Sequence, residues 1–215
     1  MIRENKALFL DGVDGYVELT NITSLDIYKS FSIGIWVLID TTSLSKGVMP
    51  LVCTESNLIC MWVDSGVVFA SYGNTTVNST SLLTPNEWFS IMYIYDESEY
   101  SIKLYIDGQL SSQSTSTAPL DLSEYHNTAS DILYIGRDHS NYFTGLVDEV
   151  IFYNVALLTS EVGSHVYLPS MTKYPTFHNY GQLYYKMDQA SEDLYLRNEG
   201  LLGIHGKVHG NPVFK

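Results

Sequence analysis

The sequence predicts an all-β protein, built as an antiparallel β-sandwich in a single domain. Short apolar stretches with the two-residue alternation of strands recur along the chain, and turn residues separate them. The 17 tyrosines and 15 glycines, with many Ser and Thr and no long Ala-, Glu- or Lys-rich run, favour strands over helices. With 45% hydrophobic and 16% charged residues, a chain of 215 residues can bury one sizeable core.

The predicted strands are separated by short turns. In chain order they cover residues 7–10, 16–19, 31–40, 49–53, 58–63, 66–71, 88–95, 100–106, 132–136, 145–154, 182–187, 204–208 and 212–214. The clearest alternation is in residues 100–106, and the Asp107-Gly108 pair after it is typical of a hairpin turn. Residues 31–40 carry large apolar side chains on both faces, which predicts a central strand that is covered on both sides.

Four stretches are expected to lie outside the strands. Residues 74–84 are polar and predict an exposed loop, and residues 120–130 predict a long loop. Residues 159–163 can form a single helical turn with Thr159 as its N-cap. Residues 166–181 contain two prolines and little apolar alternation, so they predict a linker.

The whole chain, residues 1–215, is expected to form one sandwich domain. Residues 6–165 would form the core of this domain, and residues 182–214 would contribute strands that close it. A segment as short as 182–214 cannot bury a core alone. It should therefore dock on the first part of the chain.

Residues 145–154 form the most apolar long strand, yet they include two adjacent carboxylates, Asp148 and Glu149. Strict alternation would place these two side chains on opposite faces. The Asp148 face would hold Leu146, Val150 and Phe152, and the Glu149 face Val147, Ile151 and Tyr153. Whichever face is buried, one carboxylate then lies in an apolar row and needs a partner or a metal ion.

The charge balance bears on the class of partner. A net charge of −13 argues against binding to nucleic-acid backbones and to anionic membranes. It is compatible with cation binding, and also with solubility alone. No apolar run reaches 18 residues, so we expect no helix that inserts into a membrane.

Three glycosylation sequons favour an extracellular or cell-surface location. They begin at Asn21, Asn74 and Asn78. No leader-like segment is recognisable, because Met1 is followed almost directly by the first predicted strand. We therefore expect the chain to be a piece of a longer protein with neighbouring domains.

The two cysteines, Cys53 and Cys60, lie on either side of a predicted turn. Their spacing would let them face each other across a hairpin and form a disulfide. Two unpaired core thiols are the alternative. A zinc site is disfavoured, because structural zinc takes four protein ligands.

Three segments carry a family pattern. They are Ala7-Leu-Phe-Leu-Asp-Gly-Val-Asp-Gly-Tyr-Val17, Trp88 through Leu104-Tyr-Ile-Asp-Gly108, and Ile135-Gly136 through Gly145-Leu-Val-Asp-Glu-Val-Ile-Phe-Tyr-Asn-Val-Ala-Leu157. In order and spacing, over about residues 6–165, they resemble the laminin-G-like, pentraxin-like branch of the concanavalin A-like jelly-roll superfamily. The resemblance implies a jelly-roll sandwich and leaves the function open, because this fold hosts lectin-like, adhesive and enzyme-associated modules.

The C-terminal stretch carries a further part of the resemblance. Leu183-Tyr-Tyr-Lys-Met-Asp188, with residues 193–212, resembles the segment that normally precedes the first strand in this family, yet here it comes last. Either the domain is circularly permuted, or the chain is one period of a tandem array. Both explanations predict that residues 182–214 pair with strands near the N-terminus, because an open sheet edge invites aggregation.

The resemblance also implies a structural calcium ion near the turn after the first strand and near the Asp-Glu pair. The matching residues are Asp11, Asp14 and Asp148, with Asp193 as a further candidate. Calcium takes several oxygen ligands, and Gly-rich turns expose carbonyl groups. The alternative is that Asp11 and Asp14 shape an Asx-type turn while Asp148 pairs with Arg137 or with backbone amides.

Sugars dock on aromatic rings that lie beside polar groups, and four candidate residues lie on or next to predicted loops. They are Trp62, Tyr72, His139 and Tyr142. The alternative is that Trp62 belongs to the core and the tyrosines to an ordinary sandwich surface. We assign no catalytic residues, because the predicted core strands lack the Glu-x-Asp-x-x-Glu pattern of jelly-roll glycosidases and no histidine pair has helical metal-binding spacing.

The expected function is that of a non-catalytic recognition module of a larger secreted or cell-surface protein. It would bind a glycan or protein ligand, serve in adhesion and be stabilised by calcium. One alternative is a jelly-roll glycoside hydrolase or an enzyme-associated carbohydrate-binding module. A structural subunit of a larger assembly is a second alternative.

Overall fold

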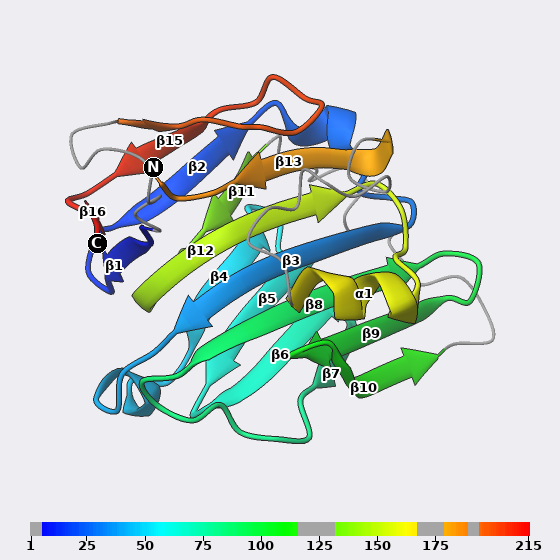
Figure 1. The fold of residues 1–215 in the computed structure, drawn as a ribbon, viewed down its shortest axis with the longest axis horizontal. Coiled ribbons are helices and arrows are strands. Elements are labelled where there is room, and N and C mark those ends of the chain that lie inside the picture. The colour runs from blue at the N-terminus through cyan, green and yellow to red at the C-terminus, as the bar shows by residue number, and fades with distance from the viewer. Residues whose placement is uncertain (1–5, 116–131, 167–178, 189–193) are drawn as a thin grey trace.

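The structure is a computed structural model that describes residues 6–115, 132–166, 179–188 and 194–215, and these residues form two antiparallel sheets packed face to face (Figure 1). Each sheet has eight strands within these residues. The predicted all-β sandwich is therefore confirmed.

The front layer in Figure 1, sheet A, has the strand order β10-β9-β8-β3-β12-β1-β16, and β13 also pairs with β12. Its strands are β1 (Leu8–Asp11), β3 (Phe31–Leu38), β8 (Trp88–Asp96), β9 (Ser101–Ile106), β10 (Gln109–Thr115), β12 (Thr144–Tyr153), β13 (Gly181–Tyr185) and β16 (Val213–Phe214).

The second layer, sheet B, has the strand order β14-β15-β2-β11-β4-β5-β6-β7. Its strands are β2 (Tyr16–Thr20), β4 (Met49–Thr54), β5 (Ile59–Asp64), β6 (Val67–Tyr72), β7 (Thr75–Asn78), β11 (Ile132–Ile135), β14 (Tyr195–Leu196) and β15 (Gly206–His209). Two short 3-10 helices, η1 (Ile22–Leu25) and η2 (Ser43–Ser45), lie in the connections on either side of β3.

The main core lies between the sheets. The inward side chains of β3 are at most 1% exposed, as its alternation predicts; they are Phe31, Ile33, Ile35 and Val37. The ring centroid of Phe31 lies 5.3 Å from that of Tyr93 in β8 and 5.7 Å from that of Phe152 in β12. The central strands of sheet A are therefore held together by side chains as well as by the backbone ladder.

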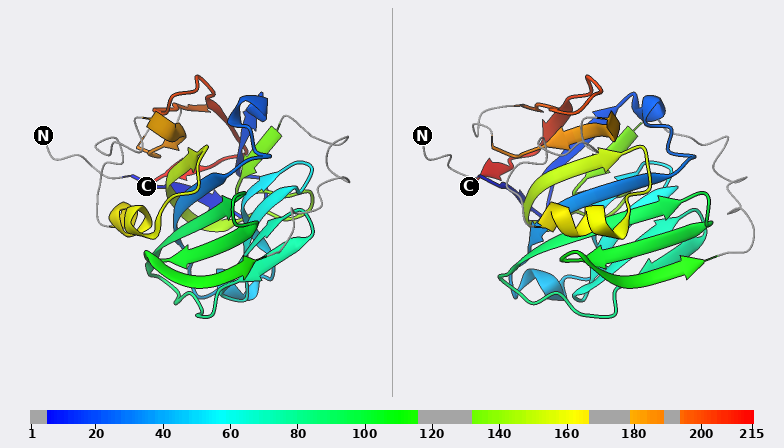
Figure 2. Two further views of the ribbon diagram at one scale, coloured as in Figure 1. Left: turned by 90° about the vertical axis from the view of Figure 1, so that its right-hand side faces the viewer. Right: turned by 45° about the vertical axis from the view of Figure 1, so that its right-hand side comes forward.

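The outer face of sheet A is covered too. Helix α1 (Thr159–Val166) and the chain before it lie over this face (Figures 1 and 2), where Leu157 and Val162 are buried against side chains of β8, β9 and β12. The helix is longer than the predicted turn, and Thr159 is its first helical residue rather than its cap. The carboxylate of Glu161 instead accepts the N–H of Leu158 at 2.8 Å, which satisfies an amide at the helix start.

Strands from the end of the chain close both sheets, as predicted. β15 pairs with β2, and β16 pairs with β1. Beyond β16, Ala7 and Lys215 exchange two backbone hydrogen bonds, of 2.8 and 2.9 Å. The first and last strands therefore lie side by side, as Figure 1 shows.

The strict alternation predicted for residues 145–154 is wrong, because β12 contains a β-bulge. In the pairing with β3, the register shifts between Asp148 and Ile151, and Glu149 adopts a left-handed backbone with φ of +48°. Val147 therefore points into the main core together with Val150 and Phe152, whereas Ile151 packs on the outer face. Asp148, next to Val147, consequently points to the outer face of sheet A.

The prediction that residues 74–84 form a loop is also wrong in part, because β7 lies among them. β7 is an edge strand in which Val77 is 5% exposed and points into the core. The other three residues of β7 are polar and lie at the surface, so the sequence offers one apolar position only. A strand with such a weak pattern forms because β6 supplies a paired neighbour.

Some predictions concern residues that the structure does not describe. The predicted loop at 120–130 and most of the predicted linker at 166–181 lie outside the described residues. The division into 6–165, 166–181 and 182–214 stays a prediction. Where the helices are described, none has the length and apolar character needed to cross a membrane.

Candidate functional site

The outer face of sheet B carries aromatic side chains around one arginine. Val17 of β2 and Ile135 of β11 point into the core, so their neighbours Tyr16 and Tyr134 point outward. β11 pairs with β2 so that Ile135 lies opposite Val17, which brings the two tyrosines side by side. Their ring centroids are 5.7 Å apart in an edge-on arrangement.

We call Tyr16, Tyr134, Tyr142, His209 and Arg137 the tyrosine–arginine cluster. The guanidinium carbon of Arg137 lies 4.6 Å from the ring centroid of Tyr16, 5.1 Å from that of Tyr134 and 5.7 Å from that of Tyr142. These distances are within the range of cation–π attraction. Tyr134 is buried, and the other four side chains are partly exposed. Segments far apart in sequence therefore meet on one open sheet face.

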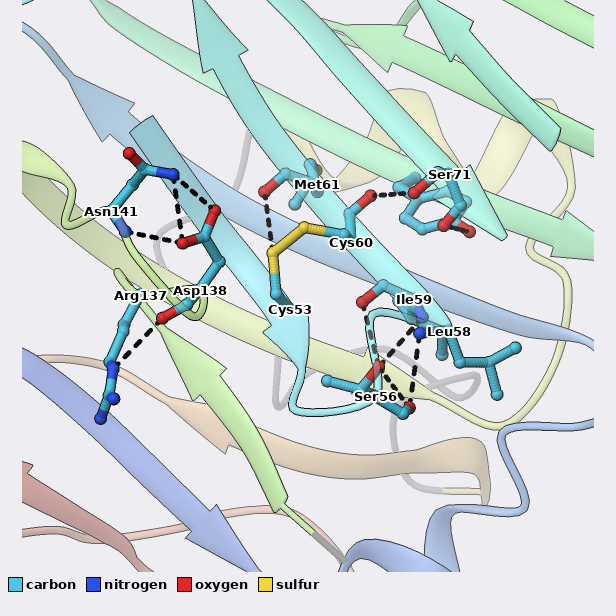
Figure 3. Close-up of a disulfide and its surroundings, with 12 residues drawn as sticks. Cys53, Ser56, Leu58, Ile59, Cys60, Met61, Ser71, Arg137, Asp138 and Asn141 are labelled. Atoms are coloured by element: carbon cyan, nitrogen blue, oxygen red, sulfur yellow. Dashed lines mark hydrogen bonds between the residues drawn. A yellow bond between two sulfur atoms is a disulfide. The ribbon is translucent and has the colours of Figure 1, made fainter. Parts of the chain in front are cut away.

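The loop after β11 holds Arg137 and Tyr142 in place. These two residues form a β-bridge. Between them, the carboxylate of Asp138 accepts the backbone N–H groups of Ser140 and Asn141, both at 2.7 Å. Asp138 therefore shapes the turn, and its carboxylate points toward Asn141 and away from the guanidinium (Figure 3). The Nε of Arg137 donates to the backbone carbonyl oxygen of Asp138 at 3.2 Å.

His209 and Glu18 form a polar edge of the cluster. The imidazole of His209 stacks on the ring of Tyr16 with a centroid distance of 4.5 Å, and its Nε2 lies 3.5 Å from a carboxylate oxygen of Glu18. Burial lowers the pKa of His209, and the opposing effect of Glu18 does not restore it. At neutral pH the imidazole is therefore mainly neutral, and its buried Nε2 makes no hydrogen bond with a described residue. His209 therefore contributes a ring rather than a cation.

A disulfide lies beside the cluster on the same face. Cys53 of β4 and Cys60 of β5 are opposite each other in register and are bonded, with their Cα atoms 4.1 Å apart (Figure 3). Tyr134 pairs with Cys53 from the other side. The bond therefore joins the two strands next to the cluster.

Three of the four predicted ligand residues lie at the surface, and one of these three belongs to the tyrosine–arginine cluster. Tyr142 is a member of the cluster. His139 is exposed in the same loop, between Arg137 and Tyr142. Trp62 is partly exposed on the outer face of β5, where its ring stacks on that of Phe69 at a centroid distance of 5.1 Å.

The expectation that Tyr72 lies at a loop and contacts a ligand is wrong. Tyr72 is fully buried, because it shares the inward face of β6 with Val68 and Ala70. Its hydroxyl group donates a hydrogen bond of 2.7 Å to the carbonyl oxygen of Ile27. The side chain therefore belongs to the core.

Two of the predicted calcium ligands, Asp11 and Asp148, lie too far apart to bind the same ion. One carboxylate oxygen of Asp11 accepts the N–H groups of Val13 at 2.9 Å and of Asp14 and Gly15 at 3.4 Å. Partial burial raises the pKa of Asp11, but these hydrogen bonds outweigh it and hold the pKa below its usual value. Asp11 lies opposite Thr144 in β12, so it is four strand positions, roughly 13 Å, from Asp148.

Asp148 is 6% exposed and accepts the N–H of Glu149 at 2.8 Å. It does not pair with Arg137, which lies on the other sheet. Burial raises the pKa of Asp148 to about 8, and the carboxylates of Glu149 and Asp188 add to this effect. Among the described residues, no three His, Cys, Asp or Glu side chains form a group that could hold a metal ion. Asp193 lies outside these residues, and calcium binding stays a prediction.

We expect Asp11→Ala to lower the free energy of unfolding by about 1 to 2 kcal/mol, because the turn loses the acceptor for three amides. The loss of stability should be equal in excess calcium and in chelator, because the carboxylate of Asp11 already accepts hydrogen bonds from backbone amides. Thermal melts in both buffers measure this, with the exposed Asp14→Ala as the control in the same turn. A calcium-dependent gain in melting temperature that Asp11→Ala abolishes would instead make Asp11 a calcium ligand.

The sequence profile of the concanavalin A-like lectin/glucanases superfamily matches residues 11–163. The chain belongs to this superfamily. The resemblance seen in the sequence is therefore confirmed. No curated protein matches the sequence.

Solved structures share this concanavalin A-like fold. A candidate carbohydrate-binding protein from Bacteroides ovatus ATCC 8483 has a TM-score of 0.74 and 17% identity, over 100% of this chain and 60% of that chain. A structure of botulinum neurotoxin type C, whose cell entry depends on interaction with two ganglioside molecules, has a TM-score of 0.58 and 14% identity, over 75% and 41% of the two chains. The receptor-binding domain of the botulinum neurotoxin C/D mosaic serotype has a TM-score of 0.56 and 12% identity, over 76% and 46%.

At these identities the likeness shows the fold alone. The concanavalin A-like domain described here spans 60% or less of the length of each of these three proteins. It is thus similar to a part of each.

Proposed function

We propose that this domain is a non-catalytic glycan-recognition module of a larger secreted or cell-surface protein, and that the tyrosine–arginine cluster is its binding site. The observation that carries the proposal is the set of rings gathered around Arg137 on the open face of sheet B. A superfamily that includes lectins, and fold neighbours described by carbohydrate or ganglioside binding, support it.

The cluster has the chemistry that a sugar needs. The apolar C–H faces of a pyranose can stack on an aromatic ring, and its hydroxyl groups need hydrogen-bonding partners at the rim. The hydroxyl groups of Tyr16 and Tyr142 make no hydrogen bond with a described residue, so both can serve a ligand. Glu18 and His209 supply an acceptor and an imidazole on the same side.

The disulfide and the sequons support an extracellular or cell-surface location. Disulfides persist mainly in oxidising compartments, and Cys53 and Cys60 are bonded. The acceptor residues Asn21, Asn74 and Asn78 are all exposed, as glycosylation requires.

The placement of the acidic residues supports a role without catalysis. Glycosidases use two carboxyl groups across a sugar-binding cleft. Two of the acids near the cluster have other partners: Asp138 accepts the amides of Ser140 and Asn141, and Glu55 accepts the hydroxyl of Tyr134 at 3.3 Å. The third, Glu18, lies 3.5 Å from His209. Asp148, whose pKa is raised, lies in sheet A, away from the tyrosine–arginine cluster.

We expect Tyr142→Ala to weaken glycan binding by about tenfold or more, because truncating a central aromatic contact typically costs over 1 kcal/mol. A glycan array identifies a ligand for the purified domain, and calorimetric titration then compares the variant with the wild type. Tyr180→Ala is the matched control, since Tyr180 is 44% exposed and directly precedes β13 in sheet A.

Three outcomes would contradict the proposal. An unchanged affinity in Tyr142→Ala would move the binding site elsewhere. Release of reducing ends from a bound polysaccharide would favour the glycoside hydrolase. The absence of any glycan ligand would favour protein binding or a structural role.

A further inference from the structure

Arg137 is a cation without an acidic partner in the part of the chain that the structure describes. Acidic residues outnumber Lys and Arg by 24 to 11 in this chain, yet Arg137 makes no ion pair with any residue that the structure describes. The adjacent carboxylate of Asp138 is taken up by the amides of Ser140 and Asn141 and points away (Figure 3). The loop thus keeps the nearest acid from neutralising the arginine.

The rings leave most of the hydrogen-bonding edge of the guanidinium free for a ligand. A guanidinium group has five N–H donors in its plane, and aromatic rings contact it mainly through its faces. Only the Nε donor has a partner among the described residues, the carbonyl oxygen of Asp138. The remaining donors form the fork that binds a carboxylate with two parallel hydrogen bonds.

We propose that the tyrosine–arginine cluster selects sugars that bear a carboxylate, with Arg137 binding the carboxylate and the tyrosines contacting the sugar ring. This inference rests on the proposed function of the cluster and names the chemical class of its ligand. Uronic acids and sialic acids share this chemistry.

Because the chain as a whole is negatively charged, selectivity for a carboxylate would depend on Arg137. A net charge of −13 repels anions at long range, so general attraction to polyanions does not contribute. Glu18 lies on the same face, 3.5 Å from the mainly neutral imidazole of His209, and its charge would also oppose an anion. Affinity for an acidic sugar must then come from the positioned guanidinium and is expected to disappear with it.

The test compares matched ligands on the folded, disulfide-bonded domain. Calorimetric titration compares two matched pairs: a uronic-acid oligosaccharide with its carboxyl-reduced neutral form, and a sialylated oligosaccharide with its desialylated form. A sulfated oligosaccharide is titrated as well. We expect each carboxylated ligand to bind about tenfold to a hundredfold more tightly than its neutral form, as a charged hydrogen-bonded pair supplies. Arg137→Met should abolish this ratio and keep the binding of the neutral form.

Two further variants separate recognition from folding. Arg137→Lys keeps the charge but loses the fork, so it should retain only part of the ratio. Lys207→Met removes an exposed cation from β15 on the same sheet and should leave the ratio unchanged. Thermal melts confirm that each variant is folded.

The failures can be told apart. Equal binding of acidic and neutral forms, or preference for the sulfated ligand alone, overturns the carboxylate inference and leaves glycan recognition standing. A ratio that survives Arg137→Met overturns the role of Arg137. If none of the oligosaccharides or array glycans binds, the proposed function itself fails.

Discussion

Deletion of residues 194–215 is expected to abolish cooperative folding. The deletion removes β14, β15 and β16, and with them the buried side chains of Leu196 and Phe214. β1 and β2 would then become open edges, because β16 and β15 are their outer partners. We expect an aggregation-prone protein without a sharp thermal transition, as measured by near-ultraviolet circular dichroism and light scattering.

A point substitution keeps this prediction testable where the deletion gives no soluble protein. Phe214→Ala should cost about 3 kcal/mol or more, because Phe214 is 6% exposed and fills the core at the end of sheet A. Its neighbour Val213 is 41% exposed, so Val213→Ala should cost less than about 1 kcal/mol. A soluble deletion variant that melts as cooperatively as the full chain would show that the C-terminal strands are dispensable.

Asp148→Asn is expected to stabilise the domain increasingly as the pH rises from 5 to 8. Burial raises the pKa of Asp148 to about 8 in the folded protein, whereas an unfolded Asp has a pKa of about 3.9. Between these values the folded state binds more protons than the unfolded state, so stability falls as the pH rises. At about 1.4 kcal/mol per pH unit, the variant should gain on the order of 3 kcal/mol relative to wild type by pH 8.

Denaturant unfolding of both proteins in chelator, at several pH values, measures this difference. In thermal melts it corresponds to roughly 6 to 12 °C for a domain of this size. Glu97→Gln, at an exposed turn, removes the same charge without the burial and should show no such trend. A parallel pH dependence of Asp148→Asn and wild type would mean that Asp148 does not carry the burial penalty. A gain in chelator that reverses in calcium would support the predicted ion at Asp148.

The sequence predicted the positions of most strands well, but it predicted less well which side chains of a strand face the core. Alternation located β3 and β9 because each buries a continuous row of apolar side chains. It could not place β7, which has one inward residue, Val77, and depends on its neighbour β6. It also assigned the wrong face within β12, because a bulge at Asp148 and Glu149 leaves no mark in a pattern that is apolar on both sides.

The candidate site was only partly predictable for a related reason. Tyr142 could be recognised as a loop aromatic, but Tyr16, Tyr134 and His209 lie in three different strands. These rings meet through strand register, which the sequence does not reveal. One signal was available: Tyr134 occupies an outward position between the inward residues Leu133 and Ile135, and Tyr16 directly precedes the inward Val17. Tyr72 was misplaced because its position at the end of β6 resembles a loop, whereas its face is inward.

The pairing of the two ends of the sandwich has a practical consequence. Ala7 and Lys215 are joined by backbone hydrogen bonds of 2.8 and 2.9 Å, so a short peptide linker could connect Lys215 to Ala7 without distorting the sheets. A backbone-cyclised protein of this kind would have fewer unfolded conformations than the linear form. It would also offer no terminus to exopeptidases, and the face with the tyrosine–arginine cluster would be unaltered.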